Sequence, residues 1–267
     1  MGDGRAARTL APLLSQAGHE LLWQWSRRTS QPVVSLAPVD AVLIAVSDHA
    51  IAEISRRLAE RTSATDEVWL HLSGALPSQT ARWDDRRPRA VGTLHPMVAL
   101  GGATASLDHL RGATCGIAGD GPAVKAARAL GESLQMTVVQ IGDDDRALYH
   151  AAAVTVAGHA TALLWQATEM LRCVGFEEAQ ARGALAALMH TALDNLSDGT
   201  PADQITGPVA RGDARTVGLH LEALQRELPE ALPSYVSLAR ASLSLSRAAL
   251  TPKVVQAIER ELARFTP

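Results

Sequence analysis

A glycine-rich turn at the start of the chain is the first feature whose spacing could do chemistry. Six consecutive residues give the pattern G-x-G-x-x-A: Gly2, Asp3, Gly4, Arg5, Ala6 and Ala7. In dinucleotide-binding proteins such glycines form a tight turn and let the backbone approach a pyrophosphate at the N-terminus of the next helix. The pattern therefore predicts a dinucleotide site. A plain glycine-rich helix start is the alternative, because this motif alone is weak.

Two arginines indicate which dinucleotide would bind. Arg27 and Arg28 follow Ser26 at the end of a predicted strand. They stand about 24 residues after the glycines, near the spacing at which such proteins contact the ribose. Arginines rather than Asp or Glu at this place match a 2′-phosphate, so we expect NADP. A solvated turn is the alternative interpretation of both arginines.

Histidines and one arginine are the candidates for the reaction itself. His95 lies at the carboxyl end of a predicted strand, and His150 opens the first helix of the second half of the chain. Histidine titrates near neutral pH, so either residue could protonate a carbonyl oxygen. The two lysines, Lys125 and Lys253, are not placed for that task. Arg211 lies in a glycine-flanked loop and has the planar fork that clamps a carboxylate in two bonds. A structural role is the alternative for each.

Two further residues, Ser73 and Gly74, end another predicted strand and could lie along the nicotinamide ribose, with a plain strand-to-helix turn as the alternative.

A metal site is not expected. His150 and His159 would lie on opposite faces of a regular helix, since nine residues turn it by about 100° each. The sequence also contains no HExxH or CxxC pattern.

The first 143 residues alternate β-branched runs with helical stretches, which predicts a parallel sheet covered on both faces. The predicted strands are 20–25, 40–46, 68–72, 90–94, 114–118 and 137–141, with helices at 50–61 and 123–134 between them. From there only helices are expected, at 144–174, 177–196, 214–227, 233–249 and 251–264. The fold class is thus α/β: a Rossmann-type parallel sheet domain at 1–142, followed by an all-helical domain at 143–267.

One element of that fold is missing from the sequence. A glycine turn of this kind should follow an apolar strand of about five residues, yet only Met1 precedes Gly2. In the usual strand order 3-2-1-4-5-6 that strand is central, and its loss would leave ladder groups unpaired at about 1–3 kcal/mol each. We therefore expect the reading frame to start upstream, and the form starting at Met1 to bind the cofactor poorly.

Composition excludes several classes of protein. Hydrophobic residues make up 47% of the 267 residues and the net charge is −3, so we expect a soluble folded protein that binds neither nucleic acid nor an anionic membrane. No targeting segment is visible, and the apolar stretch 151–165 is too short for a membrane span. Two cysteines without a CxxC favour a reducing cytoplasm.

Several longer motifs carry a family resemblance. Besides the opening Gly2–Ala6, these are Ala45–Asp48 (AVSD), His71–Leu76 (HLSGAL), Leu94–Met97 (LHPM), Ala147–Ala153 (ALYHAAA) and Thr206–Asp213 (TGPVARGD). With them the chain resembles the bacterial Rossmann-like proteins that have a C-terminal domain of unknown function 2520. These are relatives of the pyrroline-5-carboxylate reductase and 6-phosphogluconate dehydrogenase superfamily.

The resemblance implies an NADP-binding domain, with contacts that include Val46 and Ser47, joined to a helical dimerisation domain. It also implies a homodimer and reduction of 2-oxo acids such as 2-dehydropantoate. The sequence departs from the family at the absent opening strand and at Gly158-His159, where relatives often carry an asparagine. The expected function is an NADP-dependent oxidoreductase reducing a small oxo acid or imine. The alternative is a non-catalytic NADP-binding sensor or assembly protein.

Overall fold

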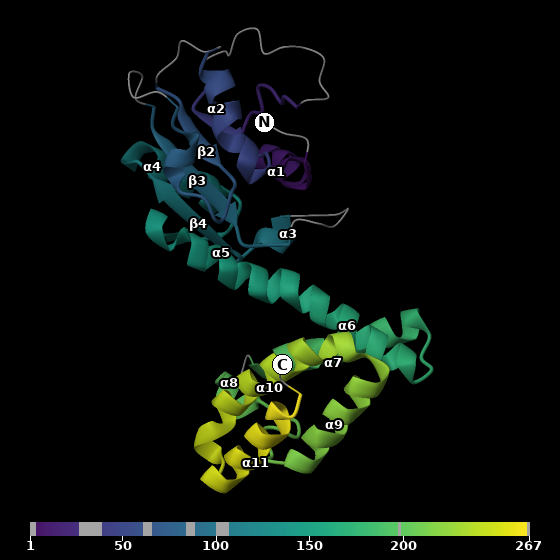
Figure 1. Cartoon of the computed structure of the whole chain (residues 1–267). Coiled ribbons are helices and arrows are strands. Elements are labelled where there is room, and N and C mark those ends of the chain that lie inside the picture. Colours follow the sequence, from purple (N-terminus) through teal and green to yellow (C-terminus); the bar gives the residue numbers. More distant parts are fainter. Residues whose placement is uncertain are drawn as a thin grey trace. The chain divides into compact units, whose positions relative to one another are not determined.

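The computed structural model of the chain describes residues 4–26, 39–60, 66–83, 89–99, 107–196 and 199–265. These residues form two compact units, Met1–Gly158 and His159–Pro267 (Figure 1). The first unit contains the sheet and the start of the long helix that follows it, and the second contains helices.

A five-stranded sheet in the order β1-β2-β3-β4-β5 is the centre of the first unit. The strands are β1 (Ala41–Ile44), β2 (Val68–His71), β3 (Val91–Pro96), β4 (Thr114–Gly119) and β5 (Thr137–Gln140). Five of the six predicted strands are thereby confirmed, and so is the Rossmann-like α/β class.

The direction of one strand pair corrects the expectation of an all-parallel sheet. β1, β2 and β3 run parallel, β4 runs antiparallel to β3 with Pro96 opposite Cys115, and β5 is parallel to β4. A parallel connection needs a long crossover, usually a helix. The described part of the connection between β3 and β4 contains only the four-residue helix α3 (Leu107–Leu110), so the sheet is mixed.

Helices cover both faces of the sheet. On one face, α1 (Arg5–Gln16) and α4 (Gly121–Ser133) bury Leu10, Leu13 and Ala127 against Leu70 and Ile117. On the other face, α2 (Ile51–Ala59) packs onto β1 and β2 in a second cluster that contains Trp69. Short 3₁₀ turns, η1 (Asp48–Ala50), η2 (Ser78–Ala81) and η3 (Asp143–Asp145), connect these elements.

The predicted strand at 20–25 is wrong. This segment follows α1 but does not join the described sheet. Its side chains lack the alternating burial of a half-buried strand, since the adjacent residues Leu21 and Leu22 are 40% and 49% exposed. Trp23 and Trp25 instead pack against the cluster that α2 forms with β1.

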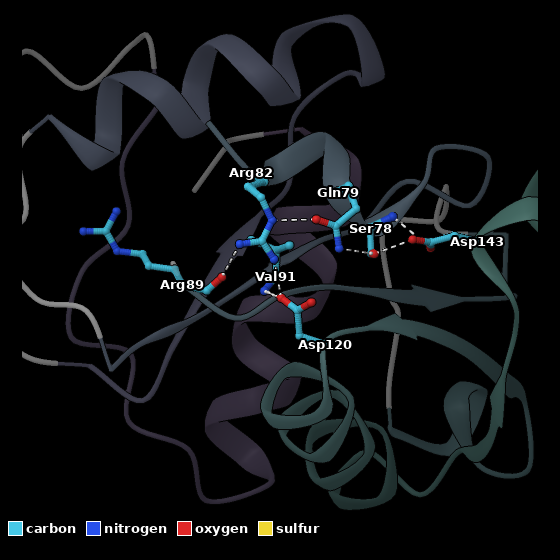
Figure 2. A network of polar contacts seen from close by, with 7 residues as sticks. All are labelled: Ser78, Gln79, Arg82, Arg89, Val91, Asp120 and Asp143. Atoms are coloured by element: carbon cyan, nitrogen blue, oxygen red, sulfur yellow. Dashed lines mark hydrogen bonds and ion pairs between the residues drawn. The ribbon is translucent and has the colours of Figure 1, made fainter. Parts of the chain in front are cut away.

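A network of polar contacts holds η2 to the rest of the first unit (Figure 2). Arg82 donates to Asp120 Oδ2 at 2.6 Å, and the same oxygen accepts from the backbone amide of Val91 at 2.8 Å. At the other end of η2, the amide and hydroxyl of Ser78 donate to the carboxylate of Asp143, at 2.9 and 2.5 Å. The network therefore connects η2 to β3, to the start of α4 and to the residues just before α5.

A long helix begins at α5 (Arg146–Val154), passes through a π-helical turn (Thr155–His159) and continues as α6 (Ala160–Cys173). The division between the two units falls within the π turn, later than the expected boundary near Gly142, because α5 contacts the strands of the first unit. Within the described residues, one helix, Asp143–Cys173, is long and apolar enough by length and composition to cross a membrane.

The second unit contains the remaining helices. These are α7 (Glu178–Leu196), α8 (Pro201–Gln204), α9 (Ala214–Glu227), α10 (Leu232–Ser246) and α11 (Pro252–Ala263), with 3₁₀ turns η5 (Pro229–Ala231) and η6 (Arg247–Ala249). Val217, Leu221, Leu243 and Ile258 are the centre of their core. The predicted helices agree with these bounds to within a few residues, apart from the π turn, which the periodicity did not indicate.

Candidate functional site

His95, near the end of β3, and the α5 residues Tyr149 and His150 form a cluster of three rings in the first unit. His95 Nδ1 lies 3.0 Å from Tyr149 Oη. The His95 ring meets Tyr149 and His150 edge to face, with ring centroids 5.5 and 5.6 Å away. The structure thus brings together the two predicted proton donors and adds a tyrosine that was not among the predicted site residues.

Two glycines leave the space that this cluster occupies. A Cβ atom at Gly74 would lie 2.6 Å from His150 Nδ1 and 2.7 Å from His95 Nε2. A Cβ atom at Gly116 would lie 2.6 Å from Tyr149 Oη. Any larger residue at either position would have to displace a ring, so the cluster requires both glycines. This gives Gly74 a packing role that the sequence did not indicate.

Replacing Gly74 with alanine should therefore lower the free energy of unfolding by about 1–3 kcal/mol, the usual cost of an overpacked site. Thermal or denaturant unfolding measures this change. Gly158→Ala is the matched control, because the nearest atom to its Cβ would be an ordinary 3.5 Å away. Alanine is also the better helix former, so the control should be neutral or stabilised. An unchanged stability of the Gly74 variant would show that the histidines move aside freely.

Arg146, the first residue of α5, holds the turn after β2 in place. Its side chain is fully buried, and it donates from Nε to the carbonyl of Leu76 at 2.8 Å and from Nη2 to the carbonyl of Ser73 at 2.6 Å. Nη1 is buried without a hydrogen-bond partner among the described residues. Burial lowers the pKa of Arg146. The arginine thereby fixes the turn that contains Gly74 beneath the two histidines.

Sequence reasoning missed Arg146, although one signal was present. An arginine at the first position of a helix faces the positive end of the helix dipole, which disfavours a cation there. The unfavourable position points to contacts of the side chain outside its own helix. Here these contacts are with the pair of carbonyl groups in the turn after β2.

Burial changes how His95 can act. Desolvation, with the nearby charges of His150 and Arg146 adding to it, lowers the pKa of His95 to about 4. His95 is therefore neutral at pH 7. This corrects the expectation that its ring titrates near neutral pH. A neutral imidazole still donates one N–H hydrogen bond. Burial also raises the pKa of the neighbouring Cys115 thiol to about 12, so this cysteine stays protonated.

The described residues of the predicted cofactor site fit an anionic group at the start of α1. Gly4 is the N-cap of α1 and provides no side-chain cap, and the first turn carries no acidic residue but contains Arg5 and Ala6. A long helix whose N-terminal amides are uncapped and flanked by an arginine suits a pyrophosphate. Ser26 is buried. The other predicted contacts at the two ends of this region, Gly2, Asp3, Arg27 and Arg28, lie outside the described residues.

The remaining predicted cofactor contacts follow β1 and β2, whose carboxyl ends share one edge of the sheet because the two strands are parallel. Val46 is half-buried and Ser47 is exposed. The Ser73 hydroxyl is already used in its turn: it donates to Asp48 Oδ2 at 2.9 Å and accepts from two backbone amides. A cofactor contact by these residues stays a prediction.

Arg211 belongs to the second unit, where it is exposed in the loop before α9. Its role as a carboxylate clamp stays a prediction. Asp213, two residues on, caps α9 and accepts a hydrogen bond from the amide of Thr216 at 3.0 Å. Across the described parts of the chain, no group of three or more His, Cys, Asp or Glu side chains is arranged to hold a metal ion.

Comparison with known proteins gives a match to one family model and shows the fold. Residues 113–242 match the model of the domain of unknown function DUF2520. No curated protein sequence matches the chain.

Solved structures match over most of the chain. A protein described as a candidate NADP oxidoreductase from Bacteroides fragilis is 20% identical, with 91% of this chain and 96% of that chain covered and a TM-score of 0.76. A Thermotoga maritima protein is also 20% identical, covering 81% and 82%, with a TM-score of 0.66. Plasmodium falciparum pyrroline carboxylate reductase, solved with NADP bound, is 10% identical, covering 98% and 95%, with a TM-score of 0.57. The chain therefore matches the DUF2520 model over residues 113–242 and has a Rossmann-like fold similar to that of these solved structures.

Proposed function

We propose that the protein is an NADP-dependent reductase of a small oxo acid or imine. The observation that carries this proposal is the cluster of His95, Tyr149 and His150 above Gly74. It places ring nitrogens at the carboxyl end of parallel strands, which is where open α/β sheets bind ligands. The fold shared with NADP oxidoreductases supports the cofactor.

When bound, NADPH supplies a hydride to the carbonyl or imine carbon. Gly4 and Arg5 would hold its pyrophosphate, and Arg27 and Arg28 its 2′-phosphate. The protein's own task is then to hold a proton near the substrate oxygen or nitrogen, at a ring nitrogen of His95 or His150. Arg211 belongs to the second unit, and its binding of a substrate carboxylate stays a prediction.

Turnover can be tested by following NADPH oxidation across a panel of small 2-oxo acids and cyclic imines. With an active substrate, His95→Gln and His150→Gln should each lower kcat by about 10²–10⁴-fold, the usual contribution of a positioned proton donor. His190→Gln, at an exposed site on α7, should leave kcat unchanged. Tight NADPH binding without turnover on any substrate would favour the alternative, a non-catalytic NADP-binding sensor or assembly protein.

The choice of cofactor gives a separate prediction. Replacing Arg27 and Arg28 together with alanine should weaken NADPH binding by about 2–4 kcal/mol, because each charged hydrogen bond to a phosphate contributes about 1.5–3 kcal/mol. Binding of NADH, which lacks the 2′-phosphate, should hardly change. Calorimetric titration of both cofactors into both proteins measures the effect. An equal loss for NADH and NADPH would contradict the assignment.

We also propose that the protein is a homodimer that pairs through the second unit. Large apolar side chains on α6 and α7 are exposed there, notably Trp165 at 61%, Leu188 at 66% and Leu193 at 55%. An exposed apolar surface of this kind is typical of an interface. A second copy of the chain would cover it. Pairing of two copies would also explain why the long helix is apolar, and no membrane would be needed to cover it.

Light scattering should accordingly give the mass of a dimer for the parent and of a monomer for the double variant Trp165→Glu, Leu188→Glu. Two buried charges in an apolar interface would cost more than most interfaces gain. Arg226→Glu on α9, an exposed charged site, is the control and should stay dimeric. A monomeric parent would overturn this part of the proposal.

A further inference from the structure

The hydroxyl of Tyr149 has two acceptors within reach, and their distances differ. Tyr149 Oη lies 3.0 Å from His95 Nδ1 and 3.4 Å from the carbonyl oxygen of His95. Hydrogen bonds from hydroxyl groups to oxygen have lengths of about 2.5–3.0 Å, so the longer contact is weak. The contact with Nδ1 is therefore the shorter and stronger of the two for the hydroxyl proton.

The surroundings of Tyr149 keep that proton in place. Burial raises the pKa of Tyr149, so the hydroxyl stays protonated at any pH near neutrality. Gly116 has no side chain that would push the hydroxyl away, whereas a Cβ atom there would lie 2.6 Å from Tyr149 Oη. The edge-to-face contact of the two rings, with an interplanar angle of 84°, fixes the direction of the pair.

His95 is neutral at pH 7, so one of its two ring nitrogens carries a proton and the other does not. If Nδ1 accepts from Tyr149, the proton must be on Nε2. Nε2 points to the space above Gly74, where a Cβ atom would lie 2.7 Å away. Among the described residues Nε2 has no hydrogen-bond partner. It does not belong to the fully buried polar atoms that lack a partner, so Nε2 is not fully buried.

We propose that Tyr149 is a positioning residue that locks His95 in the Nε2–H tautomer, so that His95 presents a neutral N–H donor to the substrate. The further step, that this donor meets a carbonyl oxygen, rests on the proposed function. A carbonyl oxygen is the fitting partner because it always offers lone pairs, whereas a protonated imine nitrogen offers none. The site is therefore suited to 2-oxo acids rather than to iminium substrates.

The experiment is nitrogen NMR of the ring signals in the full chain labelled at histidine, because the two neutral tautomers give different patterns. His95→Gln identifies the His95 signals among those of the nine histidines. The test variant is Tyr149→Phe, which keeps the ring and removes only the hydroxyl. The parent should show His95 as Nε2–H. In Tyr149→Phe the ratio of the two tautomers should change about tenfold towards Nδ1–H. The free energy of one hydrogen bond corresponds to about a tenfold change in an equilibrium constant.

The chain offers a matched control in its other tyrosine. Tyr235 Oη lies 2.7 Å from Nδ1 of His220 in the second unit, again with the two rings edge to face. Tyr235→Phe should alter the His220 signals and leave those of His95 as in the parent. Circular dichroism of both variants confirms that they are folded.

The outcomes separate this proposal from the proposed function. If the parent shows His95 as Nδ1–H, or if Tyr149→Phe leaves the His95 tautomer unchanged, the positioning role of Tyr149 is overturned whatever the enzyme turns over. If the tautomer changes as expected but no substrate is reduced, Tyr149 still positions His95 and only the reductase assignment fails. With an active 2-oxo acid, Tyr149→Phe should lower kcat with little change in KM.

Discussion

Replacing Arg89 with methionine should lower the free energy of unfolding by about 3–5 kcal/mol, the usual cost of removing one partner from a buried ion pair. The side chains of Arg89 and Glu67 are 4% and 1% exposed, and Arg89 Nε lies 3.4 Å from Glu67 Oε1. The guanidinium also lies over the ring of Trp69, 4.9 Å from its centre. Without Arg89, the Glu67 carboxylate would stay buried, with the indole N–H of Trp69, 3.2 Å away, as its hydrogen-bond donor among the described residues. Urea unfolding measures the loss.

A second substitution shows whether the lost charge is the cause. In the double variant Glu67→Gln, Arg89→Met, glutamine still accepts from the indole N–H of Trp69 but carries no charge. The double variant should therefore recover at least half of the stability that Arg89→Met loses. If it is as unstable as the single variant, the loss comes from the packing of the arginine stem and not from an unpaired carboxylate.

Lowering the pH from 7 to 4 should cost the first unit about 3 kcal/mol through His95 alone. The pKa of His95 is about 4 in the folded protein against an ordinary value of 6.5. Between these values the unfolded chain binds a proton at this ring and the folded protein does not, so stability falls as the pH falls. Each pKa unit corresponds to about 1.4 kcal/mol. His71, whose pKa burial also lowers, adds to the loss with the same sign.

The contribution of His95 can be isolated from that of the carboxylates by comparison with His95→Gln. Denaturant unfolding of both proteins over this pH range gives the difference in slope. The variant should lose about 3 kcal/mol less than the parent on going from pH 7 to pH 4. If the two curves are parallel, His95 is protonated in the folded protein as readily as in the unfolded chain.

Much of the fold could be predicted because hydrophobic periodicity reports burial. The run at β1 and the fully buried β2 stood out as strands, and the amphipathic stretch at α9 was predicted with its observed bounds. Periodicity carries no information on strand direction, so the antiparallel pairing of β3 with β4 was missed. The tryptophan-rich segment at 20–25 was misread because aromatic residues favour strands only where a neighbouring strand can pair with them.

The candidate site could be predicted only in part, for a related reason. His95 and His150 were found because their types and their places at the ends of elements suggest chemistry. Tyr149 stands next to His150, but its role depends on the direction of its side chain, which sequence does not report. The clearance above Gly74 and the buried contacts of Arg146 are properties of packing between elements far apart in the chain.

The exposed Trp165 on α6 also gives the protein a built-in optical reporter. The other four tryptophans, Trp23, Trp25, Trp69 and Trp83, all belong to the first unit, so Trp165 is the sole indole of residues 159–267. Its emission should be that of a water-exposed indole in a dilute monomer and should move to shorter wavelength as a second copy covers it. Trp165→Phe removes this signal without a charge. The difference spectrum of the two proteins therefore reads association directly from a dilution series.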